Sequence, residues 1–286
     1  MNSNILVTGA NGQLGSEIKE LSQNYKYNIF FTDVKLLDIS NKKAIEDFIK
    51  QNSIDTIINC AAYTAVDKAE EEKELADKIN HIAVKNLAEV SKEFDISLVH
   101  ISTDYVFNGL SYRPYKESDK TEPQSVYGST KLMGEEAMID ISPKNSIIIR
   151  TSWLYSTFGA NFVKTMLIVG RERESLNVIF DQIGTPTYAK DLADTILNIL
   201  PKLNNKDVEI YHYSNEGVCS WFDFAKAIFE LEGMDIKVNP ILSEAYPTPA
   251  KRPYYSVLDK SKIKKNFDIE ISYWKNSLID CLKGLN

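Results

Sequence analysis

The feature that most constrains the fold is a regular alternation of short apolar runs with helix-length stretches in the first half of the chain. The candidate strands are residues 5–7, 28–32, 56–58, 98–101 and 146–149. The candidate helices between them are residues 14–21, 42–50, 75–94 and 126–139. A repeated β-α order predicts a parallel sheet that is covered by helices on both faces. We therefore expect a doubly wound α/β fold.

Three glycines stand at a fixed spacing directly after the first predicted strand. They are Gly9, Gly12 and Gly15, in the stretch Thr8-Gly9-Ala10-Asn11-Gly12-Gln13-Leu14-Gly15. Between a strand and a helix, this spacing suits a tight turn, a close backbone approach to a pyrophosphate and close helix packing. The N-terminus of the following helix would also favour the anion. An ordinary β-α turn is the alternative, but the position of the glycines favours a dinucleotide-binding Rossmann fold.

An acidic residue, Asp33, follows the second predicted strand. At this place a carboxylate can accept hydrogen bonds from both hydroxyls of an adenosine ribose, which favours NAD over NADP. Lys35 lies two residues later and would instead suit a 2′-phosphate. The expected cofactor is therefore NADH or NADPH.

The β-α rhythm breaks after Arg150. Aromatic residues, later short strands and a loop punctuated by Pro247, Pro249 and Pro253 follow. We expect residues 1–150 to form a dinucleotide-binding domain, to which later segments return. Residues 151–286 are expected to form mainly a smaller α/β substrate-binding region.

Composition argues against several classes of function. The chain has 33 Lys and Arg against 40 Asp and Glu, a net charge of −7, whereas nucleic-acid-binding proteins usually carry a basic face. No apolar run approaches the roughly 18 residues that a membrane span needs, and the start does not resemble a secretory signal. We expect a cytoplasmic protein with neither nucleic acid nor membrane as a partner.

The spacing Tyr-x-x-x-Lys occurs twice, and in a chain with 15 tyrosines the spacing alone carries no weight. Tyr112 and Lys116 enclose Pro114, which resists helix continuation, so these two side chains need not share a face. Tyr127 and Lys131 instead open a predicted helix, where side chains four residues apart are neighbours. The second pair is therefore the one expected to act together.

A catalytic role suits these residue types. A tyrosine with a pKa of about 10 is a poor acid at neutral pH, but a nearby cation such as Lys131 would lower that pKa. Thr103 closes the fourth predicted strand, at the edge of an open α/β sheet where ligands bind. Its hydroxyl could polarise a carbonyl group. The structural alternatives are a loop-capping Thr103 and a half-buried aromatic Tyr127.

Together, the glycine turn, Thr103 and the Tyr127-Lys131 pair resemble an extended short-chain dehydrogenase/reductase over essentially the whole chain. Further stretches narrow the likeness to the dTDP-4-dehydrorhamnose reductase family. They are Ala65-Val66-Asp67-Lys68-Ala69-Glu70, Ser102-Thr103-Asp104-Tyr105-Val106-Phe107, Arg150-Thr151-Ser152-Trp153, Asn161-Phe162-Val163-Lys164-Thr165-Met166, Asp181-Gln182-Ile183-Gly184-Thr185-Pro186-Thr187 and Pro249-Ala250-Lys251-Arg252-Pro253.

The resemblance implies roles for individual residues. Tyr127 would donate a proton, while Lys131 would hold the nicotinamide ribose. The implied cofactor contacts, including those expected from the glycine turn and the second strand, are Gly9, Asn11, Gly12, Gln13, Leu14, Asp33, Asp38, Ile39, Ala62, Tyr63 and Thr64. The implied contacts to a dTDP-deoxysugar are Thr103, Asp104, Tyr105, Trp153, Asn161 and Arg252. Core packing of Trp153 and a surface ion pair of Arg252 are the alternatives.

The implied activity is an NAD(P)H-dependent reduction of the C4 ketone of dTDP-4-dehydro-L-rhamnose to dTDP-L-rhamnose. A nucleotide-sugar epimerase or dehydratase on the same scaffold is a rival. Dehydratases carry an acidic residue after the Thr-Asp pair, whereas Tyr105 follows Asp104 here. A non-catalytic NAD(P)-binding regulatory subunit is a third interpretation, because fold alone cannot exclude it.

Some members of the family are bridged into a dimer by magnesium held by acidic residues. Glu17 is available for such a site, but Lys190 stands where the resemblance calls for a carboxylate. His81, His100 and His212 show no metal-like spacing. We expect no bound metal, and either a monomer or a metal-independent homodimer.

Overall fold

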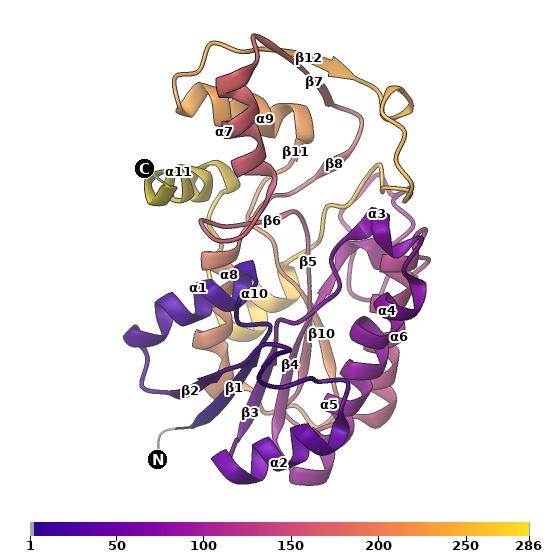
Figure 1. Cartoon of the computed structure of the whole chain (residues 1–286), viewed down its shortest axis with the longest axis vertical. Coiled ribbons are helices and arrows are strands. Elements are labelled where there is room, and N and C mark those ends of the chain that lie inside the picture. The colour runs from indigo at the N-terminus through magenta and orange to yellow at the C-terminus, as the bar shows by residue number, and fades with distance from the viewer. Residues whose placement is uncertain (1–2, 286) are drawn as a thin grey trace.

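The computed structural model describes residues 3–285, and its core is a six-stranded parallel sheet (Figure 1). The strands run in the order β10-β5-β4-β3-β1-β2. Their bounds are β1 (Asn4–Thr8), β2 (Asn28–Phe31), β3 (Thr56–Asn59), β4 (Ser97–Thr103), β5 (Ile147–Thr151) and β10 (Glu209–His212). The order reverses between β1 and β3, whose carboxyl ends open the crevice where ligands of such sheets bind. The doubly wound α/β fold expected from the sequence is confirmed.

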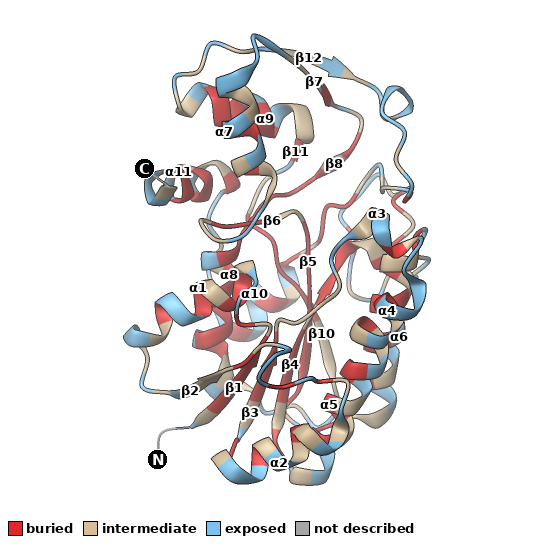
Figure 2. Ribbon diagram, viewed as in Figure 1, coloured by how far each residue is buried: buried red, intermediate tan, exposed pale blue. Residues whose placement is uncertain are grey.

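Helices cover both faces of the sheet. One face carries α1 (Gln13–Leu21), α8 (Ala189–Ile199) and α10 (Ser261–Phe267), and the other carries α2 (Lys42–Asn52), α5 (Ala83–Phe94) and α6 (Val126–Ile141). Successive side chains of β1 point to opposite faces, so Ile5 and Val7 join the first core and Leu6 joins the second. Figure 2 shows the central strands buried between these two layers.

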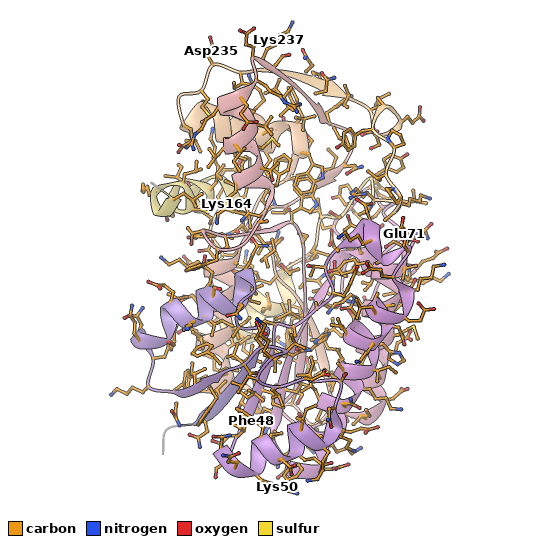
Figure 3. The ribbon with its side chains drawn as sticks, in the orientation of Figure 1. Phe48, Lys50, Glu71, Lys164, Asp235 and Lys237 are labelled. Carbon is orange, nitrogen blue, oxygen red and sulfur yellow. The ribbon has the colours of Figure 1, made fainter. Side chains whose placement is uncertain are left out.

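A smaller unit lies beyond the carboxyl ends of the strands (Figure 1). Its helices are α7 (Phe162–Glu172), α9 (Trp221–Leu231) and α11 (Trp274–Leu285), and its paired short strands are β7 (Ser175–Ile179) with β12 (Lys237–Ile241), β8 (Ile183–Gly184) with β11 (Cys219–Ser220), and β6 (Leu154–Tyr155) with β9 (Thr187–Tyr188). This unit has a core of its own. Figure 3 shows Asp235 and Lys237 at its outer end and Lys50 at the opposite end of the molecule.

The single helix expected over residues 75–94 is wrong in detail. The structure has α4 (Lys73–Asp77), a π-helical turn (Lys78–Ile82) and then α5. Asn80 lies in the π-helical turn, fully buried, and its side-chain amide bonds to both the backbone nitrogen and the backbone oxygen of Tyr63. These bonds join segments that are 17 residues apart, so helical periodicity could not reveal them. The remaining short elements are α3 (Val66–Ala69) and 3₁₀ turns at Ser22–Asn24, Asp104–Val106, Leu200–Lys202 and Ser243–Ala245.

Candidate active site

The turn after β1 depends on glycine. Gly9 has a φ of +66°, and a Cβ at this position would lie only 2.6 Å from the backbone nitrogen of Ala61. Gly12 then precedes α1, and no side chain of the described residues caps this helix end. The first N–H groups of α1 therefore stay available to an anion, which the helix dipole favours.

A cavity of about 360 Å³ opens beside this turn. Predicted cofactor residues that line it are Gly9, Gly12, Asp33, Asp38, Ile39 and Ala62. The other predicted cofactor residues near the turns, Asn11, Gln13, Leu14, Tyr63 and Thr64, do not line it within the described chain. The cavity and the open helix end fit the adenosine and pyrophosphate parts of a dinucleotide.

Sequence reasoning missed part of the cavity wall. Cys60, Leu75, Lys78 and Ile79 also line the cavity, the last three from α4 and the π-helical turn. No local motif marks them, because they reach the crevice only when this segment packs beside the sheet. Lys78 adds a positive charge close enough to Asp38 to help lower the pKa of that carboxyl.

The two acidic residues of this region are already engaged by local partners. Asn11 donates a hydrogen bond to the Asp33 carboxylate, and the backbone nitrogen of Lys35 donates to it at 3.3 Å. Asp38 accepts bonds from the hydroxyl of Ser40 at 2.7 Å and from its backbone nitrogen at 2.9 Å. The Ser40 bonds lower the pKa of Asp38. Asp33 is thus held at the mouth of the cavity, next to the glycine turn.

Thr103, Tyr127 and Lys131 come from neighbouring elements. Thr103 ends β4, while Tyr127 and Lys131 lie in the first two turns of α6. Ser125 fixes the start of this helix, because its hydroxyl accepts a bond from the backbone nitrogen of Gly128 at 3.2 Å. A Cβ on Gly128 would lie 2.3 Å from the carbonyl oxygen of Tyr105, so glycine allows α6 to approach the end of β4.

Burial shifts the pKa values of both Tyr127 and Lys131. It raises the pKa of Tyr127 to about 12, although the neighbouring Thr103 hydroxyl acts in the opposite direction. Lys131 does not lower that pKa as expected from the sequence. Its ammonium nitrogen turns into the sheet, where it lies 2.6 Å from the carbonyl oxygen of Ile101 and 3.2 Å from Nε2 of His100. Burial lowers the pKa of Lys131 to about 8.

The other Tyr-x-x-x-Lys match lies elsewhere. Tyr112 is 92% exposed, and residues 111–120 contain no helix. Tyr112 and Lys116 therefore lack the helical geometry that brings Tyr127 and Lys131 together.

Two predicted substrate residues adjoin Tyr127. The Tyr105 and Tyr127 rings meet edge to face, with centroids 5.4 Å apart. Asp104 is 2% exposed and accepts a bond from the Thr103 hydroxyl at 3.0 Å, while its Oδ2 has no hydrogen-bond partner among the described residues. Burial raises the pKa of Asp104 to about 6. A polar ligand group at this point would meet a carboxyl that still has an acceptor to offer.

Trp153 is held in an unusual conformation. Its φ is +47°, a value that bulky side chains rarely adopt. Its ring stacks on Trp221 with centroids 3.6 Å apart and planes 8° from parallel. Trp153 is half-buried and packs, together with Trp221, against the core of the smaller unit.

Asn161 and Arg252 have protein partners in this structure. Asn161 caps α7 through the backbone nitrogen of Lys164 at 3.1 Å and donates to Oε1 of Gln13 at 3.0 Å. Arg252 binds the Asp67 carboxylate with two nitrogens, at 2.9 and 2.7 Å. Asn161 therefore links the smaller unit to the glycine turn, and Arg252 links the proline-rich loop to α3.

Comparison with known proteins places this site in a family. Residues 3–286 match the family described as RmlD substrate binding domain. The chain is 43% identical, over 285 residues that cover 96% of both proteins, to a dTDP-4-dehydrorhamnose reductase of Aggregatibacter actinomycetemcomitans. The chain belongs to the dTDP-4-dehydrorhamnose reductase family. The resemblance expected from the sequence motifs is confirmed.

Solved structures of this reductase family agree with the assignment. A dTDP-4-dehydrorhamnose reductase from Clostridium acetobutylicum superimposes with a TM-score of 0.93 at 45% identity, covering 99% of each chain. One from Bacillus anthracis, solved in complex with NADP, gives a TM-score of 0.94 at 40% identity and covers 99% of this chain and 100% of its own.

Two further findings concern metals and membranes. Among residues 3–285, no three His, Cys, Asp or Glu side chains are grouped so that they could hold a metal ion. In the same described part of the chain, every helix is too short or too polar to cross a bilayer.

Proposed function

We propose that the chain reduces the C4 ketone of dTDP-4-dehydro-L-rhamnose to dTDP-L-rhamnose, with NADH or NADPH as the reductant. The observation that carries this proposal is the convergence of Thr103 and Tyr127 at the carboxyl end of β4, in a member of the dTDP-4-dehydrorhamnose reductase family. The reduced nicotinamide supplies the hydride. The chain's own residues must supply the proton and the binding of the sugar nucleotide.

The cofactor has a natural place along the crevice. Gly12, Gln13 and Leu14 at the open end of α1 would hold the pyrophosphate, and Asp38 and Ile39 would border the adenine. Ala62, Tyr63 and Thr64 would flank the cofactor beyond β3, with Lys131 at the nicotinamide ribose. Asp33, which Asn11 orients, would meet the adenosine ribose.

Tyr127 would protonate the developing C4 alkoxide, and Thr103 would stabilise the same oxygen with its hydroxyl. Asp104 and Tyr105 would contact the deoxysugar, and Trp153 would cover it. Arg252 would meet the diphosphate, because its planar donors suit phosphate oxygens and offset the repulsion from an acidic protein. Since Arg252 binds the Asp67 carboxylate, the diphosphate would have to share Arg252 with this carboxylate or displace it.

The rival functions differ in how they treat the cofactor. A dehydratase or epimerase regenerates its bound cofactor in every cycle, and a regulatory subunit leaves it unchanged. The residues after Thr103 support the reductase, since Tyr105 stands where a dehydratase carries a carboxylic acid. The cytoplasmic location stays a prediction.

A direct test incubates the purified protein with dTDP-4-dehydro-L-rhamnose and either NADH or NADPH. We expect stoichiometric oxidation of the cofactor, followed by its absorbance, and dTDP-L-rhamnose as the product in NMR spectra. Conversion of the sugar without net cofactor oxidation would instead indicate an epimerase or dehydratase. Binding of the cofactor without any conversion of this and related keto-sugar nucleotides would indicate a regulatory subunit.

A further inference from the structure

A row of buried polar side chains crosses the sheet beneath Lys131. Thr8 in β1, Asn59 in β3 and His100 in β4 are register partners in adjacent strands, and each is at most 1% exposed. Thr8 Oγ1 lies 2.7 Å from Asn59 Oδ1, and Asn59 Nδ2 lies 3.0 Å from His100 Nδ1. His100 Nε2 then lies 3.2 Å from Lys131 Nζ. Strands covered on both faces are normally apolar, so this row needs an explanation.

The backbone fixes the direction of these hydrogen bonds. The amide nitrogen of Ala61 donates to Asn59 Oδ1 at 3.2 Å, and a backbone N–H can only donate. The oxygen of the Asn59 side chain therefore faces Ala61, and its NH₂ group faces His100. Nδ1 of His100 must accept this bond. The one ring proton of a neutral imidazole is then on Nε2, pointing at Lys131.

A hydrogen-bond donor in front of Lys131 favours one form of this side chain. An ammonium group has only donors, whereas a neutral amine has a lone pair that can accept the Nε2–H bond of His100. The carbonyl oxygen of Ile101, at 2.6 Å, accepts an N–H bond from either form. The pocket is thus complementary to the amine.

We propose that His100 is a positioning residue that stabilises the neutral amine of Lys131, so that Lys131 can return a proton to Tyr127 after each turnover. This role rests on the proposed function, in which Tyr127 protonates the substrate. Two shifts support it. Burial and the neighbouring Lys131 keep the pKa of His100 well below its usual range, so the imidazole is neutral, and burial lowers the pKa of Lys131 to about 8.

The proton balance is simple. The O–H bond of Tyr127 breaks as its proton passes to the substrate oxygen, which leaves a phenolate. The O–H bond of Tyr127 forms again when an N–H bond of Lys131 breaks and the proton reaches the phenolate through an intervening water, because the Lys131 nitrogen itself lies against Ile101 and His100. The lone pair left on Lys131 accepts the Nε2–H bond of His100 until a proton from solvent restores the ammonium group. His100 keeps its own proton, and nothing is oxidised or reduced in these steps.

Other charged groups around His100 and Lys131 do not reverse the preference of this pocket for the neutral amine of Lys131. Other titratable or charged groups on the surrounding elements are Tyr127, Glu135, Glu136 and Asp140 on α6, Asp104 after β4, Cys60 after β3 and Arg150 on β5. Glu135 acts to raise the pKa of Lys131, but its carboxylate is bound by Arg150 at 2.6 Å in a pair that is at most 3% exposed. Burial keeps the Cys60 thiol protonated, with a pKa of about 12.

The proton position can be measured without any turnover. The chain has three histidines, so ¹⁵N-histidine NMR of the ligand-free protein resolves each ring, with assignment by substituting His81 and His212 in turn. We expect His100 to be a neutral Nε2–H tautomer from about pH 5 to about pH 9. An Nδ1–H tautomer or an imidazolium would overturn the proposal. Either result is independent of whether the protein reduces a keto-sugar.

Asn59→Asp should reverse the direction of the hydrogen bond between the side chain of residue 59 and Nδ1 of His100. A carboxylate accepts instead of donating, so the His100 proton should move to Nδ1 and Nε2 should accept from the Lys131 ammonium. The alkaline limb of the kcat profile should then move up by at least about one pH unit, because Lys131 holds its proton longer. Thr8→Val removes a polar group of the same row without touching His100, and should leave the tautomer unchanged. If both variants have the same tautomer as the wild type, the row is only structural and the proposal fails.

Discussion

Asp104 offers a quantitative test of how the candidate site is built. Its carboxyl is 2% exposed, and burial raises its pKa from a usual 3.8 to about 6. This rise corresponds to about 3 kcal/mol, at about 1.4 kcal/mol for each tenfold change in proton affinity. Because the folded state binds this proton more tightly than the unfolded state, the stabilisation is complete below the unfolded pKa. It is lost as the pH rises through the folded pKa.

The perturbation is Asp104→Asn, which keeps an oxygen to accept the Thr103 hydroxyl and removes the titration. Urea unfolding at a series of pH values measures the free energy of unfolding of both proteins. Between about pH 4 and about pH 7, the wild type should lose about 3 kcal/mol relative to the variant. The variant itself should show no such decline from this position.

Asp67→Asn is a matched control with the opposite sign. Its pairing with Arg252 lowers the pKa of Asp67, so its contribution is present above the usual pKa and is lost as the pH falls. The side chain of Asp67 is 38% exposed, so its effect should be much smaller. Parallel pH profiles for the wild type and Asp104→Asn would refute the claim that a buried, easily protonated carboxyl stands at the end of β4.

Three further outcomes follow from the same geometry. Tyr127→Phe should lower kcat by about 10²–10⁴-fold with cofactor affinity nearly unchanged, while Tyr112→Phe should leave kcat as it is; weaker binding with intact chemistry would contradict the proton-donor role. Asp33→Ala should weaken NADH binding and tolerate NADPH better, and unchanged discrimination in titrations would mean that Asp33 does not contact the ribose. Light scattering should give the same oligomeric state with magnesium and with a chelator, because Glu17 is buried against Ser156 and feels the positive charge of Lys190; dissociation on chelation would contradict this expectation.

The parts of the site that the sequence predicts are those encoded locally. The glycine turn, the Asp33 position and the start of α6 each depend on residues within a few positions of one another, so spacing and helix-breaking residues suffice to find them. Pro114 separates the Tyr112 match from the Tyr127 match in the same local way. The strand bounds predicted from the sequence are also close to those of the structure, since each strand is a short apolar run between polar turns.

What the sequence could not predict depends on contacts between distant segments. The Arg252–Asp67 pair joins residues 185 apart, and the π-helical turn forms around an Asn80 bond to Tyr63. The direction of the Lys131 side chain depends on His100, which lies 31 residues away on another element. Helical spacing places Lys131 near Tyr127, but only the packed sheet shows that its ammonium nitrogen turns toward β4.

The charges of this site are arranged by depth, and that arrangement suits a hydride reduction. At the centre, burial favours the neutral forms of Asp104, Tyr127 and Lys131, with pKa values of about 6, 12 and 8. The pKa values of Asp104 and Lys131 therefore lie within about one unit of neutral pH, where both forms of each group are populated, whereas Tyr127 keeps its proton until another group takes it. In the proposed function, the positive charge for the diphosphate would come from Arg252 and from the open end of α1. A protein with a net charge of −7 repels such a ligand from a distance, so its binding would depend on these few local donors, and Asp67 would compete with the diphosphate for Arg252.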